Sequence, residues 1–360
     1  WVLHENDDPS HDMNCVVTHP SVIRAVLDYV FLALKGTGRV IVGDAPIQIC
    51  HFEDLHESMG YNRLWAFYQE KGVSLEIQDF RGLVAHETAA RKSVLRNQST
   101  GIVVDLGTQS LFADWSREKI DRMRVTNYAT GLMKRHHSEQ KHEYMINPSV
   151  LEADVVLNLA KPKSHRKSGL TACAKNFVGA CMRKEDLPHH TVGSKAEGGD
   201  EYNKKSALHK LQSRLLDRKN DSEYAGERRF FFYKWLYQCI RAVQKLSGAE
   251  KRDFSEGSWY GNDTIWRTIV DLNRILRFAD KSGALRTTPQ RTIFNVCDMI
   301  VAGEGEGPLK PSPKPMGVIV MSANIWAADR FICRLAGFSS SAIRYLSFLP
   351  DRPNEEASPL

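Results

Sequence analysis

The sequence predicts an α/β fold in which a largely parallel sheet is covered by helices in three layers, with a helical insertion in the middle of the chain. Apolar residues recur at helical spacing over Pro20–Leu34, and an apolar run typical of a buried strand follows at Arg39–Val42. The same alternation returns near the C-terminus, where a helical pattern over Thr264–Phe278 precedes a strand pattern over Arg291–Val301. Such alternation is typical of parallel strands joined by helical crossovers.

The other elements of the predicted core follow from the same two periodicities. The first helix stops at Lys35-Gly36-Thr37-Gly38, and a helix over Tyr61–Lys71 stops at Gly72, since glycine commonly follows a helix end. A last helix is expected at Ala323–Leu335. Further strands are expected at Val73–Ile77, Ile102–Leu106, Val155–Ala160 and Met316–Met321.

A polar, glycine-rich stretch interrupts this pattern after residue 183. It leads into two apolar stripes, one through Leu208, Leu211 and Leu215 and one over Phe230–Leu246, which indicate a helical hairpin. We interpret the aromatic run Phe230-Phe231-Phe232 with Trp235 as core packing. The predicted organisation is an α/β core over residues 1–183, an insertion over 184–258, a second part of the core over 259–348 and a disordered tail over 349–360.

Composition limits the classes of function. The 360 residues are 42% hydrophobic and 26% charged, and 49 basic against 43 acidic residues give a formal charge of +6. That mild excess suits a small anionic ligand and does not predict nucleic-acid binding, which requires a concentrated basic face. The seven cysteines form no C-x-x-C pair, so we expect no iron–sulfur cluster in this chain.

Cellular location is predicted only in outline. Widely spaced cysteines are typical of reduced thiols in a cytoplasmic protein, and no apolar run is long enough for a transmembrane segment. The chain starts at Trp1 rather than at Met, so we expect that its native N-terminus is missing and that targeting is not assessable.

A cationic segment after a predicted buried strand is the most informative part of the sequence. The strand Val155–Ala160 ends in Lys161-Pro162-Lys163-Ser164-His165-Arg166-Lys167, and a small-residue segment, Ser168–Ala180, follows. A helix that begins after such a loop offers free N–H groups and a partial positive charge to an anion. We therefore expect an anion-binding site that includes Lys161, Lys163, Arg166, Lys175 and Asn176.

Three residues are candidates for catalysis. His165 and Lys163 lie in the cationic segment, where His165 would act as an acid or base or bind the anion; the alternative is a surface histidine in a basic loop. Asp44 ends a predicted strand, and ligands of open α/β sheets collect beyond the carboxyl ends of strands. The alternative for Asp44 is a cap on the following turn.

A second polar segment, Gly303-Glu304-Gly305-Glu306-Gly307-Pro308, follows the predicted strand that carries Asp298. Its glycines allow a backbone to approach a ligand closely. Asp298, Glu304 and Glu306 supply oxygen atoms that suit Mg²⁺ or another hard cation. The alternative interpretation is a flexible acidic surface loop.

The predicted helix at Thr264–Phe278 carries a third group of charges. Arg267, Asp271 and Arg274 share one face by their i, i+4, i+7 spacing. They form either a helix ion pair or an arginine clamp, held by Asp271, for the anionic ligand.

These motifs together resemble the family catalogued as domain of unknown function 362. Leu157–His165 resembles its proline- and lysine-rich signature, and Gly169-Leu170-Thr171 with Lys175–Gly179 resembles the continuation of that signature. Other segments are similar to its longer members, which tend to lie among surface-polysaccharide genes: Leu187–His190, Gly198–Tyr202, Trp266–Thr268, Asp271–Arg274 and Gly303–Pro308.

The chain departs from the family pattern at several points. The usual first strand is absent, with Trp1-Val2-Leu3 as its remnant, and Ser164 and Ala160 replace a threonine and a proline of the signature. Many members carry a cysteine-rich ferredoxin-like module that this chain lacks, so their suggested redox role does not transfer.

The sequence thus supports two main hypotheses. The first is an enzyme, metal-assisted in one version, that acts on a phosphorylated or carboxylated small molecule, with a link to surface-polysaccharide metabolism. The second is a non-catalytic ligand-binding or scaffold protein, which predicts a large exposed apolar patch on the insertion. An iron–sulfur redox protein is disfavoured by the cysteine spacing.

Overall fold

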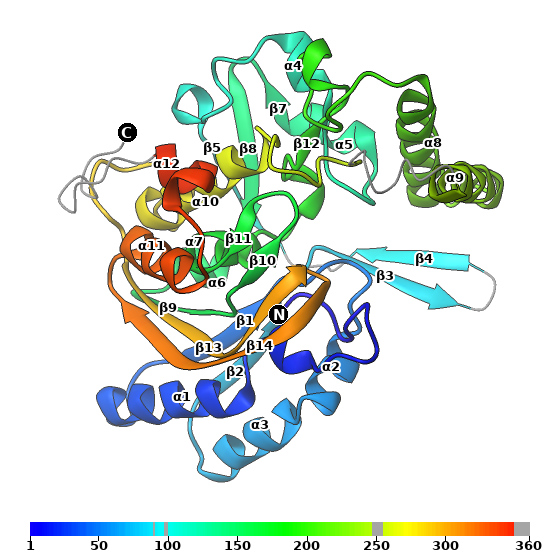
Figure 1. Ribbon diagram of the computed structural model, residues 1–360. Helices are drawn as coiled ribbons and strands as arrows, with labels where there is room; N and C mark the ends of the chain where they lie inside the picture. Colours follow the sequence, from blue (N-terminus) through cyan, green and yellow to red (C-terminus); the bar gives the residue numbers. More distant parts are fainter. Residues whose placement is uncertain (89–90, 97–99, 247–254, 349–360) are drawn as a thin grey trace.

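The computed structural model describes residues 1–88, 91–96, 100–246 and 255–348, with side chains left undescribed over 85–99 (Figure 1). The tail predicted at 349–360 lies outside this part of the chain. Helices and strands are mixed along the sequence, as expected for an α/β fold. No helix in the described ranges has the length and apolar character that a membrane crossing requires.

The central sheet is built around one long strand, β13. Its strand order is β11-β10-β13-β14, and β9 pairs with the first part of β13. Both β9 and β10 run parallel to β13, and their registers place Ala160 opposite Cys297 and Lys163 opposite Gly303. The bounds of these strands are β9 (Val155–Ala160), β10 (Lys163–His165), β11 (Gly169–Thr171), β13 (Thr292–Glu306) and β14 (Lys310–Ser322).

Within the central sheet, β13 pairs in parallel with β9 and β10, but parallel pairing is not general among the described strands. The strands β1 (Val40–Asp44) and β2 (Leu75–Asp79) also pair in parallel. By contrast, β13 and β14 form an antiparallel hairpin, because three residues connect them and a parallel crossover needs a dozen or more. The remaining pairs are antiparallel as well: β10 with β11, β3 (Leu83–Thr88) with β4 (Arg91–Arg96), β5 (Ile102–Asp105) and β7 (His137–Ser138) with β8 (Lys141–Ile146), and β6 (Met123–Arg124) with β12 (His190–Thr191).

Helices lie on both sides of the central sheet (Figure 1). On one side are α1 (Pro20–Leu34) and α3 (Tyr61–Glu70), and on the other are α7 (Cys173–Asn176), α10 (Ile265–Phe278) and α11 (Ile325–Leu335). Neighbouring strand residues serve two cores, since Val156 packs against the α10 and α11 core whereas Leu159 packs against the α1 and α3 core. The three-layer arrangement itself stays a prediction.

The remaining helices are short. The α-helices are α2 (Phe52–Ser58), α4 (Arg117–Asp121), α5 (Thr130–His136), α6 (Pro148–Leu151) and α12 (Arg344–Phe348). Single 3₁₀ turns are η1 (Met13–Cys15), η2 (Gly107–Gln109), η3 (Phe177–Ala180), η4 (Lys184–Asp186), η5 (Lys195–Glu197) and η7 (Ser340–Ala342).

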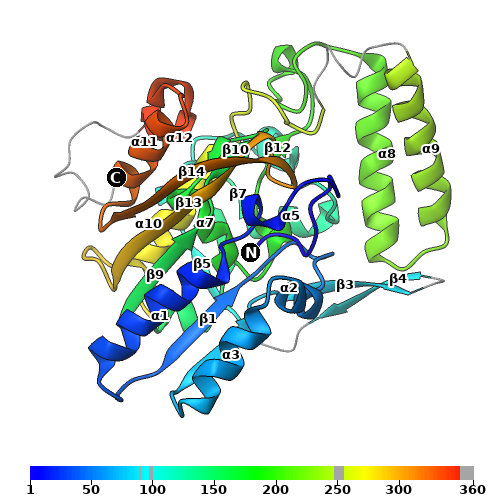
Figure 2. The same cartoon turned by 60° about the horizontal axis from the view of Figure 1, so that its bottom comes forward.

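The helical hairpin expected in the insertion is present as α8 (Ala207–Tyr224) and α9 (Arg229–Leu246). The two helices lie side by side at the edge of the molecule (Figure 2). The interpretation of their aromatic run as core packing was wrong: Phe231, Phe232 and Trp235 are 55%, 57% and 59% exposed. Because α9 packs mainly against one helix, α8, only its inner face is covered.

Candidate functional site

Lys161 and Asp298 form a buried ion pair. The Lys161 Nζ lies 2.6 Å from Asp298 Oδ2 and 3.0 Å from the carbonyl oxygen of Val301, and both charged side chains are almost fully buried. Asp298 Oδ2 also accepts a hydrogen bond from the backbone nitrogen of His19, at 2.8 Å. The structure therefore uses the Lys161 charge to neutralise Asp298 and leaves little of it for a ligand.

Lys163, two residues further on, has no such carboxylate partner in the part of the chain that the structure describes. Its Nζ donates to the carbonyl oxygens of Val16 at 2.7 Å and Lys161 at 3.2 Å. Burial, followed by the charges of Lys161 and Lys175, lowers the pKa of Lys163 to about 7. Neutral and charged forms of this amine are thus both populated near neutral pH.

Glycine is required opposite Lys163. A Cβ atom at Gly303 would lie 2.6 Å from the Cβ of Lys163. Gly307 makes a similarly close approach to Ser164, whose Oγ donates to the carbonyl oxygen of Gly305 at 2.8 Å. The first four residues of the predicted ligand-binding segment form the end of β13, and Gly303 and Gly307 allow the neighbouring strand β10 to approach closely.

Lys175, on the short helix α7, is the central feature of the site. This residue is only 8% exposed, yet its ammonium group makes no hydrogen bond or ion pair with any residue in the described ranges. Burial, followed by the charges of Lys184 and Lys167, lowers the pKa of Lys175 to about 7. A buried cation without a partner is costly, so its retention calls for a functional explanation.

Two further lysines complete what we call the lysine cluster, which consists of Lys163, Lys167, Lys175 and Lys184. Lys167 donates to Thr126 Oγ1 at 2.7 Å and to the carbonyl oxygen of Glu256, and its pKa is lowered by burial to about 8. Lys184 is buried and donates to the carbonyl oxygen of Val178. All of these acceptors are neutral oxygens, although the charges of nearby carboxylates act on Lys167 and Lys184 and oppose the effect of burial on their pKa values.

Asp44 is a carboxylate whose charge acts on two members of the cluster. Its negative charge raises the pKa values of Lys163 and Lys184, in opposition to their burial. One carboxylate oxygen contacts the backbone nitrogen of Trp1, and the other, Oδ1, is buried without a hydrogen-bond partner in the described part of the chain. A Cβ on Gly179 would collide with that oxygen, so glycine is needed there.

His165 lies within the influence of the same charges. Its Nδ1 faces the backbone nitrogens of Lys167 at 3.1 Å and Ser168 at 3.2 Å, so it accepts from both and the ring proton resides on Nε2. Burial, followed by the charge of Lys175, holds the pKa of His165 well below its usual range. This geometry favours a neutral hydrogen-bond donor over a general base.

Asn176 stabilises the scaffold around α7. Its amide nitrogen donates to Asn158 Oδ1 at 2.7 Å and to the carbonyl oxygen of Leu159 at 3.3 Å. Asn158 in turn donates to Asn295 Oδ1 at 2.8 Å and to the carbonyl oxygen of Cys173 at 2.9 Å. These amides connect α7 with β9 and β13, so they fix the position of Lys175.

The arginines of α10 do not form the predicted clamp. Arg267 donates to the carbonyl oxygen of Leu111 at 2.6 Å and lies over the Trp115 and Trp266 rings. Asp271 is fully buried, and its carboxylate accepts from Ser110, Leu111 and Tyr144 rather than from Arg267. Arg274 is buried, and the Asp271 charge raises its pKa against the larger opposing effect of burial.

The three candidate metal ligands are not brought together. Glu304 lies 3.3 Å from the ammonium group of Lys314, and Glu306 lies 2.5 Å from the guanidinium of Arg166. Asp298 precedes Glu304 by six residues on the same strand. At the usual rise of about 3.3 Å per residue, the two residues lie about 20 Å apart along the strand. The ion pair between Glu306 and Arg166 also means that the Arg166 guanidinium is directed toward the Glu306 carboxylate.

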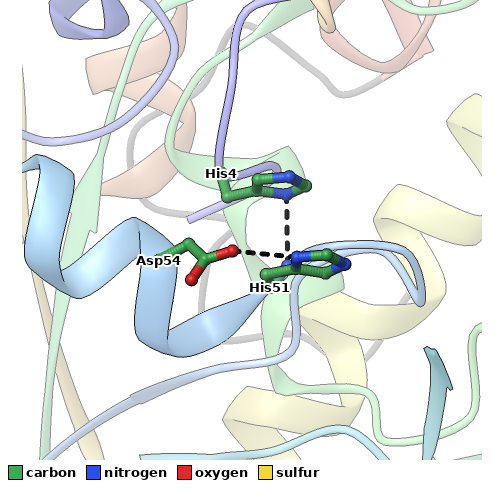
Figure 3. A group of neighbouring side chains, drawn as sticks. All are labelled: His4, His51 and Asp54. Atoms are coloured by element: carbon green, nitrogen blue, oxygen red, sulfur yellow. Dashed lines mark hydrogen bonds and ion pairs between the residues drawn. The ribbon is translucent and has the colours of Figure 1, made fainter. Parts of the chain in front are cut away.

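A different group of potential metal ligands was not predicted: His4, His51 and Asp54 (Figure 3). The two imidazole rings are stacked, with centroids 4.5 Å apart and planes inclined by 2°. His4 Nδ1 accepts from the backbone nitrogen of His51, and His51 Nδ1 lies 2.9 Å from Asp54. Lone pairs of parallel rings do not converge on one ion, so this arrangement is not that of a tetrahedral metal site.

Sequence reasoning also missed Lys184 and the role of Lys167. Lys184 follows the buried segment Cys181-Met182, and this apolar context is the one signal that could have indicated a buried lysine. The structure brings together Lys163, His165, Lys175 and Asp44. It separates them from Glu304, Glu306 and Arg267.

Comparison with known proteins gives one match. A family model described as "Domain of unknown function (DUF362)" matches residues 117–334, which is more than half of the chain and includes all four members of the lysine cluster. Neither the curated proteins nor the solved structures contain a match to this sequence.

Proposed function

The chain therefore belongs to the DUF362 family, and we propose that its lysine cluster binds the phosphate or carboxylate group of a small molecule on which the protein acts as an enzyme. The observation that carries the proposal is Lys175, a buried lysine whose ammonium group has no hydrogen-bond or ion-pair partner in the described ranges. An anion would supply the missing negative charge. Strong perturbation of several neighbouring pKa values is typical of functional sites.

Energetics favour an anion in this position. Burying an unpaired ammonium group costs several kcal/mol even after the protein relaxes, about the size of one large destabilising mutation. The charges of Lys167 and Lys184 add to that cost at Lys175. A bound dianion would offset both the cost of burying the ammonium group and its repulsion from Lys167 and Lys184. The Nε2–H of His165 would supply a neutral hydrogen-bond donor beside the charged ones.

The lowered pKa values also suggest a chemical role. At neutral pH a substantial fraction of Lys163 is a free amine, which can accept a proton from a substrate or attack a carbonyl carbon. The Asp44 carboxylate would stabilise the charged form that results. We assign anion binding to Lys175, hydrogen-bond donation to His165 and proton transfer to Lys163. A sugar phosphate or sugar acid is the substrate class we favour, through the family resemblance.

The test is stabilisation of the folded protein by inorganic phosphate. Phosphate is expected to raise the thermal midpoint of the wild type and of a control, Lys281→Met, which removes an exposed lysine. It should not raise the midpoint of Lys175→Met. An equal rise in Lys175→Met would contradict the proposal. Circular dichroism of each variant establishes that it is folded, and Lys175→Gln serves as a second variant.

A non-catalytic binding or scaffold protein is the second candidate function. The exposed aromatic side chains of α9 favour it, because that hypothesis expects an apolar patch on the insertion. Incubation with a panel of sugar phosphates and sugar acids, followed by NMR, distinguishes the two. Loss of a substrate signal that depends on Lys163 supports the enzyme, whereas binding without turnover across the panel supports the second candidate.

A further inference from the structure

We propose that the outer face of α9 binds the surface of an anionic lipid bilayer. This inference is independent of the lysine cluster, since it rests on a different part of the molecule. It starts from the large aromatic side chains that α9 exposes, since Phe231, Phe232 and Trp235 are all more than half exposed.

The exposed apolar residues of α9 form one continuous face. A helix of 3.6 residues per turn rotates by about 100° per residue, which places them in an arc of about 120° centred near Trp235 and Leu246. Leu246 is 89% exposed and Val243 is 55% exposed. The members of this apolar face are Phe231, Phe232, Trp235, Cys239, Ala242, Val243 and Leu246.

Basic residues border the apolar face on both sides. By the same rotation, Lys234, Arg241 and Lys245 fall along one edge, and Arg229 falls along the other. No aspartate or glutamate occurs between residues 228 and 246. The inner face, which includes Tyr237 and Gln244, is directed toward α8, where Gln244 donates to Gln212 at 2.8 Å.

This combination matches a bilayer surface better than a protein partner. Helices that lie in the interface of a membrane carry Trp, Phe and Leu on one face and Lys and Arg along its borders. The cations then reach the lipid phosphates while the apolar face enters the region between headgroups and acyl chains. Helix α9 can approach a plane because it is the outermost element on its side of the molecule (Figure 2).

The test measures co-sedimentation of the full chain with lipid vesicles. We expect the wild type to bind vesicles of phosphatidylcholine mixed with an equal amount of phosphatidylglycerol, and to bind phosphatidylcholine alone weakly. The double variant Phe232→Ala/Trp235→Ala should bind the mixed vesicles at least about tenfold more weakly. Lys234→Gln/Lys245→Gln should weaken binding by about 30-fold, since each basic residue near an anionic surface contributes a factor of about five.

A matched control distinguishes this face from exposed apolar residues in general. Tyr29 and Leu32 on α1 are 77% and 71% exposed, so Tyr29→Ala/Leu32→Ala removes similar side chains elsewhere and should bind as the wild type does. In addition, Cys239 is exposed whereas the other cysteines are buried. An environment-sensitive dye on Cys239 should shift its emission to the blue with the mixed vesicles.

Three results would overturn the proposal. The wild type could remain in the supernatant with the mixed vesicles, or the Phe232→Ala/Trp235→Ala variant could bind them as tightly as the wild type. The third is a wild-type dimer that this variant dissociates, without vesicle binding, which would make the face a contact between copies of the chain.

Discussion

Lys161 and Lys175 are both buried lysines of one strand–loop–helix segment, and the structure treats them differently. Lys161 is paired with Asp298 at 2.6 Å, whereas Lys175 has no anionic partner within the described ranges. The paired lysine belongs to the scaffold, and the unpaired one is the residue to which we assign anion binding. Burial of a cation therefore does not by itself identify a site; the absence of compensation does.

The largest effect is expected from breaking the paired lysine. Lys161→Met leaves Asp298 buried without its counter-charge, so it should lower the free energy of unfolding by about 3–5 kcal/mol. Urea denaturation measures this change. A loss below about 1 kcal/mol would show that the pair is not structural, and the double variant Lys161→Met/Asp298→Leu should recover much of the loss.

The opposite sign is expected at the unpaired lysine. Lys175→Met removes an uncompensated buried charge, and we expect the unliganded protein to gain about 1–3 kcal/mol of stability. The same denaturation experiment in an anion-free buffer checks it. Destabilisation by Lys175→Met would instead assign Lys175 a structural role and remove the contrast with Lys161.

The pH dependence of stability provides a smaller, separate test. The pKa of Lys175 is about 7 in the folded protein and near its ordinary, higher value when unfolded, so the unfolded state binds more protons above pH 7. Stability of the unliganded wild type should therefore rise as the pH increases from about 7 toward 9. This rise should be smaller in Lys175→Met. Equal slopes in both proteins would argue against a lowered pKa.

Anion binding should show the reverse dependence. Sulfate does not titrate in this range, and it requires charged lysines, so its affinity should fall above pH 7 by up to about tenfold per pH unit for each lysine that takes up a proton. Calorimetry in buffers of different ionisation enthalpy measures the proton uptake. An affinity that does not change with pH would mean that the cluster is already charged.

The smallest effects are expected at the exposed acidic residues. Glu304→Gln and Glu306→Gln break surface ion pairs with Lys314 and Arg166, which are worth about 0–1 kcal/mol. We expect unchanged phosphate stabilisation in both variants by thermal shift. Loss of that stabilisation in either one would bring these carboxylates back into the site.

Local sequence patterns predicted the helices and strands better than they predicted which side chains contact one another. The helix Pro20–Leu34 and the strand Val155–Ala160 are observed with the expected bounds, because periodicity and end signals are local. The prediction that Lys163, His165 and Lys175 belong to one site required only one short segment of sequence. The pairing of Lys161 with Asp298 could not be predicted, because it joins residues 137 positions apart through the register of β9, β10 and β13.

Two errors have one physical origin. By residue type alone, the glycines near residue 303 indicate a loop and the aromatic residues of α9 indicate a buried core. In the structure Gly303 lies in a strand because another strand approaches it closely, and the aromatic residues are exposed because no described element covers the outer face of α9. Neither neighbour is visible in a local window of sequence.

The close approach at Gly303 has a consequence for how this segment tolerates change. A single methyl group there would displace the strand that carries Lys163, although position 303 itself touches no ligand. Conservative replacement by alanine should then disturb the cluster as strongly as replacement of a lysine, whereas replacement of the neighbouring exposed Glu304 should not. In proteins that evolve from this chain, we expect the glycine positions of β13 to vary least.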